Sequence, residues 1–162
     1  MITVKTKIIH YIYGNCFLLF IPVIIINILF TGYLPECYLK NISHIIIYAE
    51  SIVRIILMAL SALMIIDISD RTGKTGILIY IAGLVIYSVS WLILIMYPET
   101  VAENSIILQL SGYWTATIWL IGTGITGNKL FVKIPYHYII YIILSILFGI
   151  LHTCHGYILL AK

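Results

Sequence analysis

Charged residues are scarce in this sequence. They make up 9% of its 162 residues, whereas a soluble domain has about 25%. Hydrophobic residues make up 62% of the chain, so the composition excludes an ordinary soluble domain and predicts an integral membrane protein. The net charge is only +3, and most basic residues flank the apolar runs, so we have no reason to expect a nucleic-acid partner.

Cysteines are few, and internal repeats and low-complexity linkers are absent. The three cysteines are Cys16, Cys37 and Cys154. Cys16 and Cys154 fall in predicted spans at opposite membrane depths, so we expect no disulfide framework. The length suits five helices of about 20 residues with short connections and leaves no room for a soluble domain. We therefore interpret residues 1–162 as a single transmembrane helical domain.

Long apolar runs dominate what remains, and they define the predicted fold. We expect an all-α polytopic membrane protein, a bundle of five transmembrane helices. The predicted spans cover about residues 10–34, 44–66, 76–96, 105–127 and 135–160. The first run has a basic start like that of a signal peptide, but it is too long and lacks a small-residue cleavage site. We therefore interpret it as a retained helix.

Basic residues between the runs predict the orientation. With the N-terminus inside, the inner segments hold six of them: Lys5, Lys7, Arg71, Lys74, Lys129 and Lys133. The outer segments hold Lys40 and Lys162. This distribution follows the positive-inside rule and predicts an inside N-terminus and an outside C-terminus. The expected location is the cell membrane, as a multi-pass protein, with a prokaryotic plasma membrane favoured.

A charged pair interrupts the second apolar run. Glu50 and Arg54 are four residues apart, so they lie on one helix face and can neutralise each other. A charge at a bilayer centre costs about 2.5–3.5 kcal/mol on insertion scales, so such residues by default mark a functional site. The same helix face carries Ser43, Ile47, Leu57 and Ser61. The alternative interpretation is a buried structural ion pair that fixes how this helix docks.

The last apolar run has a polar and small face at a matching depth. That face consists of Tyr138, Tyr141, Ser145, Gly149, His152, His155 and Gly156. In the predicted orientation Glu50 lies ~9 Å and His152 ~12 Å from the outer ends of their helices. We therefore predict a polar pocket in the outer half, open toward the extracytoplasmic side. Its candidate ligand-binding residues are Glu50, Arg54, His152, His155, Trp91, Tyr113, Trp114 and Gln109.

Three of these residues could also bind a metal ion, although a purely structural role would explain them as well. His152 and His155 are spaced for two ligands on one helix face, and Glu50 would add a carboxylate to complete a three-ligand set for a transition metal. Histidines near a helix end are equally common as interfacial or hydrogen-bonding residues, and Trp91 and Trp114 are also explained by packing or by the aromatic belt. No catalytic residue is assigned.

Small residues line one face of the fourth apolar run. They are Gly112, Thr115, Ala116, Gly122, Thr123 and Thr126. A stripe of this kind lets a neighbouring helix approach closely in a membrane. We therefore expect this run to pack tightly against another helix.

Two short fragments resemble motifs of a known family. Ala49-Glu50-xxx-Arg54 and Phe148-xxx-His152 resemble parts of the EExxxR and FxxxH motifs of intramembrane CAAX-type proteases. In that family two adjacent glutamates begin the first motif, and a His-xxx-Asn motif follows the second. Here Ala49 replaces one glutamate, and no later histidine is followed four residues on by asparagine. The chain is therefore not assigned to that family.

Three functions fit these features. The leading hypothesis is a small integral membrane protein whose pocket binds or translocates a small anionic or amphipathic ligand. Arg54 would hold the anionic group, Glu50 would orient Arg54 or accept a ligand proton, and His152 and His155 would hydrogen-bond or relay protons. The second is a membrane-embedded metal-dependent hydrolase acting on lipid or lipid-linked substrate. The third is an accessory or structural subunit; the expected partners are membrane lipid and a second copy or a larger membrane complex.

Overall fold

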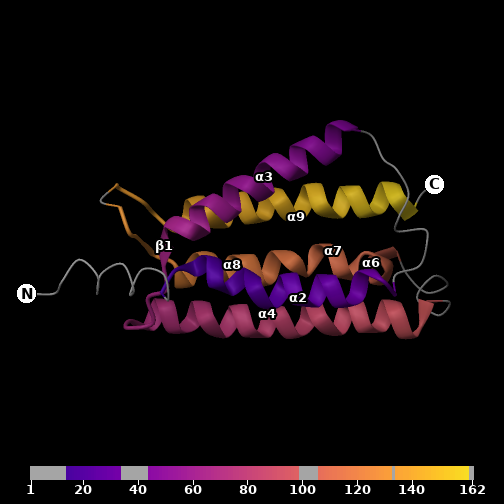
Figure 1. Cartoon of the computed structure of the whole chain (residues 1–162), viewed down its shortest axis with the longest axis horizontal. Coiled ribbons are helices and arrows are strands. Elements are labelled where there is room, and N and C mark those ends of the chain that lie inside the picture. The colour runs from indigo at the N-terminus through magenta and orange to yellow at the C-terminus, as the bar shows by residue number, and fades with distance from the viewer. Residues whose placement is uncertain (1–13, 34–43, 99–105, 133, 161–162) are drawn as a thin grey trace, which may run out of the picture.

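The protein is mostly helical. The computed structural model describes residues 14–33, 44–98, 106–132 and 134–160 (Figure 1). The helices in these ranges are η1 (Cys16–Leu19), α2 (Phe20–Thr31), α3 (His44–Leu63), α4 (Arg71–Met96), α6 (Ile106–Gln109), α7 (Ser111–Trp114), α8 (Ala116–Thr126) and α9 (Ile139–Leu160). Two short strands, β1 (Met64–Ile65) and β2 (Lys129–Leu130), pair antiparallel.

Within the described ranges, three helices are long and apolar enough to cross a membrane: α3, α4 and α9. These three correspond to the second, third and fifth predicted spans. The first predicted span contains η1 and α2, which together form a shorter apolar helix over Cys16–Thr31. These three helices suggest a membrane protein, and the count of five spans stays a prediction.

The fourth predicted span is not one continuous helix. Residues 106–126 are divided into α6, α7 and α8, with turns at Leu110 and Thr115. The Thr115 hydroxyl donates to the Ser111 carbonyl oxygen at 2.6 Å. Such bonding of a side chain back to the preceding turn bends helices. The small polar residues that allow close packing here thus also weaken the regularity of the helix.

The α4 helix starts before the predicted start of the third span. We expected the third span to begin at residue 76, after a charged turn, but the helix begins at Arg71. Asp70 caps it, because its side-chain oxygen accepts a hydrogen bond from the Gly73 backbone N–H at 2.7 Å. The cap satisfies a backbone donor that would otherwise lack a partner, so the charged residues join the helix.

The helices form layers in which consecutive segments alternate in direction (Figure 1). α4 packs along α8, α8 packs against α9, and α9 packs against α3. α3 diverges from the other helices toward its His44 end (Figure 1). A buried hydrogen bond of 2.7 Å between the Ser61 and Tyr141 hydroxyls joins α3 to α9 nearer the opposite end of α3. This bond holds the β1 end of α3 against α9, and contacts of Glu50 with His152 and His155 join the two helices again nearer the His44 end.

The α4–α8 contact is a backbone-to-backbone approach. A Cβ atom placed on Gly122 would lie 2.3 Å from the backbone nitrogen of Tyr80. A Cβ atom on Gly83 would lie 2.5 Å from the backbone nitrogen of Trp119. No side chain fits in either place, so glycine is required on both helices. The predicted close packing of the small-residue stripe is confirmed.

The end of the molecule that holds β1 and β2 is tied together by polar contacts. Met64 pairs with Leu130 and Ile65 with Lys129. The Lys129 ammonium donates to a carboxylate oxygen of Asp67, and Ser69 donates to the other oxygen through its hydroxyl and its backbone N–H. Led by the hydrogen bond from Lys129, these contacts lower the pKa of Asp67 to about 2. They link the α3–α4 connection to the α8–α9 connection.

We expect Asp67→Asn to lower the free energy of unfolding modestly at neutral pH. The free energy of unfolding should also change less between neutral and acidic pH in this variant than in the parent. The folded-state pKa of Asp67 is below the ordinary value, so its contribution is present above about pH 4 and is lost as the pH falls toward 2. The ion pair is largely exposed to solvent on the lysine side, so the cost at pH 7 should stay below about 1 kcal/mol. Thermal unfolding of the detergent-solubilised parent and variant at about pH 7 and about pH 2 measures this difference in stability. A gap between variant and parent that is equally large at pH 2 would contradict it.

Candidate functional site

A cavity of about 380 Å³ lies between five parts of the fold. α2, α3, α4, α9 and the α7–α8 region all contribute side chains to it. Its apolar and aromatic lining residues are Phe20, Val23, Ile24, Leu57, Met58, Tyr87, Trp91, Tyr113, Ala116, Trp119, Leu120, Phe148 and Leu159. Its other lining residues are Asn27, Glu50, Arg54, His152 and His155. The volume and the mainly apolar lining are typical of small-molecule sites.

Glu50 is the centre of a polar cluster on one wall of this cavity. Its side chain is 3% exposed, and both carboxylate oxygens have partners. Oε1 accepts a hydrogen bond from Arg54 Nη2 and lies 3.1 Å from His152 Nδ1. Oε2 lies 2.5 Å from His155 Nδ1. The i, i+4 spacing on α3 brings Arg54 to Glu50, and the i, i+3 spacing on α9 brings both imidazoles to the same carboxylate.

Arg54 lies at the open side of the cluster. Its side chain is 49% exposed, in contrast to the buried carboxylate that it contacts. The guanidinium carbon lies 5.6 Å from the centroid of the Phe148 ring, a cation–π distance. A guanidinium has five N–H donors, and its contact with Glu50 uses only part of them. The cluster therefore combines a neutralised interior with hydrogen-bond donors that reach the cavity.

Aromatic rings hold the first α9 histidine in place. The His152 ring stacks on Phe148 with centroids 5.1 Å apart and lies 4.9 Å from the Tyr113 ring. Gly156 makes room for Tyr113, because a Cβ atom on this glycine would lie 2.6 Å from the tyrosine ring. Packing on both sides fixes the plane of the imidazole, so Nδ1 is directed at Glu50.

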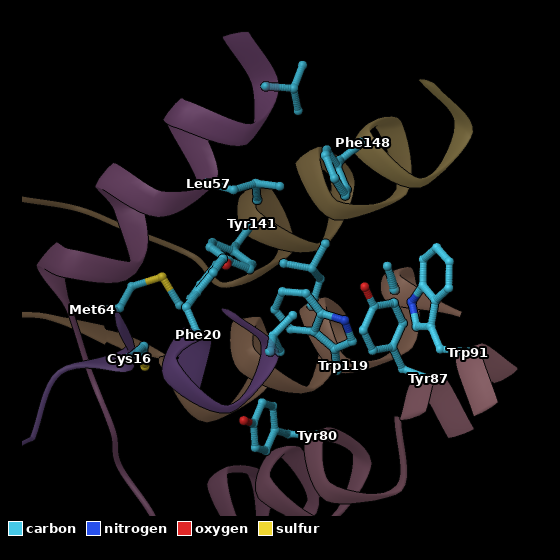
Figure 2. Close-up of a cluster of buried hydrophobic side chains, with 14 of the residues drawn as sticks. Cys16, Phe20, Leu57, Met64, Tyr80, Tyr87, Trp91, Trp119, Tyr141 and Phe148 are labelled. Atoms are coloured by element: carbon cyan, nitrogen blue, oxygen red, sulfur yellow. The ribbon is translucent and has the colours of Figure 1, made fainter. Parts of the chain in front are cut away.

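Two tryptophans form another part of the wall. Figure 2 shows the rings of Trp119, Tyr87 and Trp91 within the buried cluster, and the Tyr87 and Trp91 centroids are 6.1 Å apart. The Tyr87 hydroxyl donates to Asn27 Oδ1 at 2.6 Å. Among the described residues, no acceptor pairs with the buried indole N–H of Trp119, whereas the Trp91 side chain interacts with the Tyr87 hydroxyl. An unpaired buried donor is costly, so the Trp119 indole favours an additional bound acceptor.

Most of the predicted ligand-binding residues meet at this cavity. Glu50, Arg54, Trp91, Tyr113, His152 and His155 line it. Trp114 does not: it is 41% exposed, and its indole N–H donates to the Ile107 carbonyl oxygen at 3.2 Å. Gln109 is half-buried and also lies outside the lining. Neighbouring helical residues point about 100° apart, and here that rotation takes the Trp114 ring out of the lining while Tyr113 stays in it.

Several lining residues were not predicted from the sequence as parts of the site. Asn27, Tyr87, Trp119 and Phe148 all line the cavity. Asn27 gave the only strong signal, because an amide in an apolar run must find a partner inside the protein. The aromatic residues resemble the other aromatic residues in these runs, and only the packing shows which of them meet.

The metal interpretation gains no support from the described residues. Glu50, His152 and His155 do meet, as the suggested set of two histidines and one glutamate requires. However, no group of three His, Cys, Asp or Glu side chains within the described ranges is arranged to hold a metal ion. The observed contacts are direct hydrogen bonds between the carboxylate and the two imidazoles.

Comparison of the chain with known protein families, with characterised proteins and with solved structures finds no match. The residues that resemble fragments of CAAX-type protease motifs do come together, since Glu50 contacts Arg54 and His152, and Phe148 stacks on His152. This contact alone does not place the chain in that family. Function must therefore be inferred from the geometry of the cavity.

Proposed function

We propose that this protein binds a small anionic or amphipathic ligand in its intramembrane cavity. The observation that carries the proposal is the asymmetry of the lining: a cluster of one glutamate, one arginine and two histidines occupies one wall, and aromatic and aliphatic side chains form most of the rest. Such a cavity suits a molecule with one charged end and one apolar end. Ligand binding uses both the polar wall and the apolar lining, and so would translocation of the ligand by a larger assembly.

Arg54 would make the main contact with the anionic group of the ligand. Its guanidinium is half exposed and is held in position by Glu50 and Phe148. A carboxylate or phosphate can accept two of its N–H groups at once. His152 and His155 would add hydrogen bonds or exchange protons with the ligand through their ring nitrogens. Glu50 would orient all three side chains.

The cavity also offers a donor to an uncharged acceptor. The indole N–H of Trp119 is buried and lacks an acceptor in the part of the chain that the structure describes. A hydroxyl or carbonyl oxygen of a bound ligand would satisfy such a donor after a small side-chain adjustment. This supports a ligand with oxygen atoms beyond its anionic group.

We further propose that the chain is a five-span protein of the cell membrane with its N-terminus inside and its C-terminus outside. Alternation of direction between consecutive helical segments supports this arrangement (Figure 1). Arg71 and Lys74 in the first turn of α4, and Lys129 in β2, all belong to the end that holds β1 and β2. By the positive-inside rule that end would face the cytoplasm. The cavity would then lie nearer the extracytoplasmic side.

The hydrolase and accessory-subunit hypotheses fit less well. The three residues of the suggested metal site meet, but none of the described residue groups is suited to hold a metal. A purely structural ion pair would not require a cavity of about 380 Å³ beside it. We therefore retain ligand binding as the function that the geometry supports best.

We expect Arg54→Leu to weaken the binding of an anionic amphiphile by about tenfold or more, since a hydrogen bond to a charged group contributes about 1.5–3 kcal/mol. The probe is a long-chain alkyl phosphate in neutral detergent micelles, and the measurement is isothermal titration. The matched control is Arg71→Leu, which removes the same charge from an exposed position outside the cavity. Equal affinity of Arg54→Leu and the parent would refute the proposal.

A further inference from the structure

The cavity is closed at depth and open on one side. Among its lining residues, Leu57 is 1%, Tyr87 4% and Trp119 5% exposed. In contrast, Ile24 on α2 is 41% exposed, and the Arg54 side chain on α3 is 49% exposed. The accessible lining therefore belongs to α2 and α3, and the opening lies between these two helices.

Nothing in the packing of the described helices closes this opening. α3 packs against α9 and contacts η1, whereas α2 contacts α4, and α2 and α3 have few contacts with one another. α3 also diverges from the rest of the fold toward its His44 end (Figure 1). A side opening between two helices of a membrane protein faces the bilayer rather than water.

Apart from Arg54 on α3 and Asn27 on α2, the rim of the opening is apolar. Ile21 and Ile28 share a helix face with Ile24 and are 45% and 71% exposed. Ile55, next to Arg54 on α3, is 65% exposed. The isoleucine side chains of the rim are compatible with acyl chains, and the Asn27 amide oxygen among them already accepts a hydrogen bond from the Tyr87 hydroxyl. The guanidinium at this rim offers charge-assisted hydrogen bonds to an anionic group that arrives with such a chain.

We infer that the ligand is a membrane lipid with a phosphate or carboxylate head group, and that it enters the cavity sideways from the bilayer between α2 and α3. This inference rests on the proposed ligand-binding function and specifies its substrate class and route. The head group contacts Arg54 and the α9 histidines. Part of one acyl chain lies against Phe20 and Trp119, whose ring centroids are 5.2 Å apart, and the remainder stays in the opening.

The test uses the native tryptophans as reporters of an acyl chain inside the cavity. Of the three tryptophans, Trp91 and Trp119 line the cavity, and Trp114→Phe removes the exposed third one. The full-length Trp114→Phe protein is reconstituted in phosphatidylcholine vesicles. A minor fraction of the lipid carries brominated chains, either as phosphatidate or as phosphatidylcholine. Bromine quenches tryptophan only at close range, so quenching reports entry of the chain.

We expect the brominated phosphatidate to quench Trp91 and Trp119 at about one tenth of the mole fraction that brominated phosphatidylcholine requires. Arg54→Leu should abolish this difference. Ile24→Phe, which narrows the opening, should reduce quenching by phosphatidate. Ile25→Phe is the matched control, because residue 25 is exposed but does not line the cavity.

Two outcomes would overturn the inference and leave the proposed function standing. In the first, neither brominated lipid quenches the cavity tryptophans, although a short-chain alkyl phosphate added from water still binds in an Arg54-dependent way. In the second, both lipids quench equally well, so the site does not select an anionic head group. If neither the lipids nor the alkyl phosphate bind, the proposed function itself fails together with the inference.

Discussion

Gly122→Ala should destabilise the protein by about 3 kcal/mol or more. The added Cβ would lie 2.3 Å from the Tyr80 backbone nitrogen, 2.6 Å from its Cα and 2.9 Å from the Gly76 carbonyl oxygen. All three are backbone atoms, so no side chain can rotate away. The α4 and α8 helices would have to separate along their main contact.

Thermal unfolding in detergent, followed by circular dichroism, measures this cost. The matched control is Gly32→Ala, which adds the same methyl group at the end of α2, where nothing lies within 4 Å of the new atom. We expect the control to stay within about 0.5 kcal/mol of the parent. If Gly122→Ala unfolds at the same temperature as Gly32→Ala, the close approach of the two helices is not present in solution.

Glu50→Leu should be the second most damaging substitution. It removes the acceptor shared by Arg54, His152 and His155 and leaves a guanidinium without its counter-charge. Breaking a buried pair in this way costs about 3–5 kcal/mol, and the half exposure of Arg54 reduces our expectation to about 2–3 kcal/mol. The same thermal unfolding measurement applies.

The double variant Glu50→Leu/Arg54→Leu distinguishes the loss of the ion pair from a steric misfit of the leucine side chain at position 50. With both charges removed, no unpaired guanidinium remains, so the double variant should be more stable than Glu50→Leu alone. Its ligand binding should nevertheless be lost, because the proposed anion contact is Arg54. A double variant whose destabilisation equals the sum of the two single effects would show that the two side chains do not interact.

Local signals in the sequence were sufficient for the long helices. α3, α4 and α9 lie where the apolar runs predicted them, because a run of about 20 apolar residues satisfies its backbone only as a helix. Hydropathy did not predict the first turn of α4, because the Asp70 cap starts the helix at Arg71, five residues before the predicted start of the span at 76. Hydropathy also did not predict the division of the fourth run at Leu110 and Thr115. A hydropathy profile contains no information about hydroxyl groups that hydrogen-bond to the preceding helical turn.

The candidate site was predictable in part. Glu50 and Arg54 were found because charges in an apolar run are expensive, and their spacing fixes them on one face. His152 and His155 were matched to them by depth along an antiparallel helix, and the structure places both imidazoles on the Glu50 carboxylate. Depth alone could not determine orientation around a helix axis. Trp114, which was predicted for the site, therefore lies outside the cavity lining, and Trp119, which was not predicted for it, lines the cavity.

The sequence by itself determined the class of protein, the positions of the long helices and the residues whose burial must have a reason. These depend on composition and on spacing along one helix, which are local properties. Only the tertiary structure decided that five segments enclose a cavity, that Trp119 rather than Trp114 lines it, and that α2 and α3 leave it open at the side. Those features depend on how helices rotate and separate as they pack, and such non-local distances between side chains cannot be derived from one sequence.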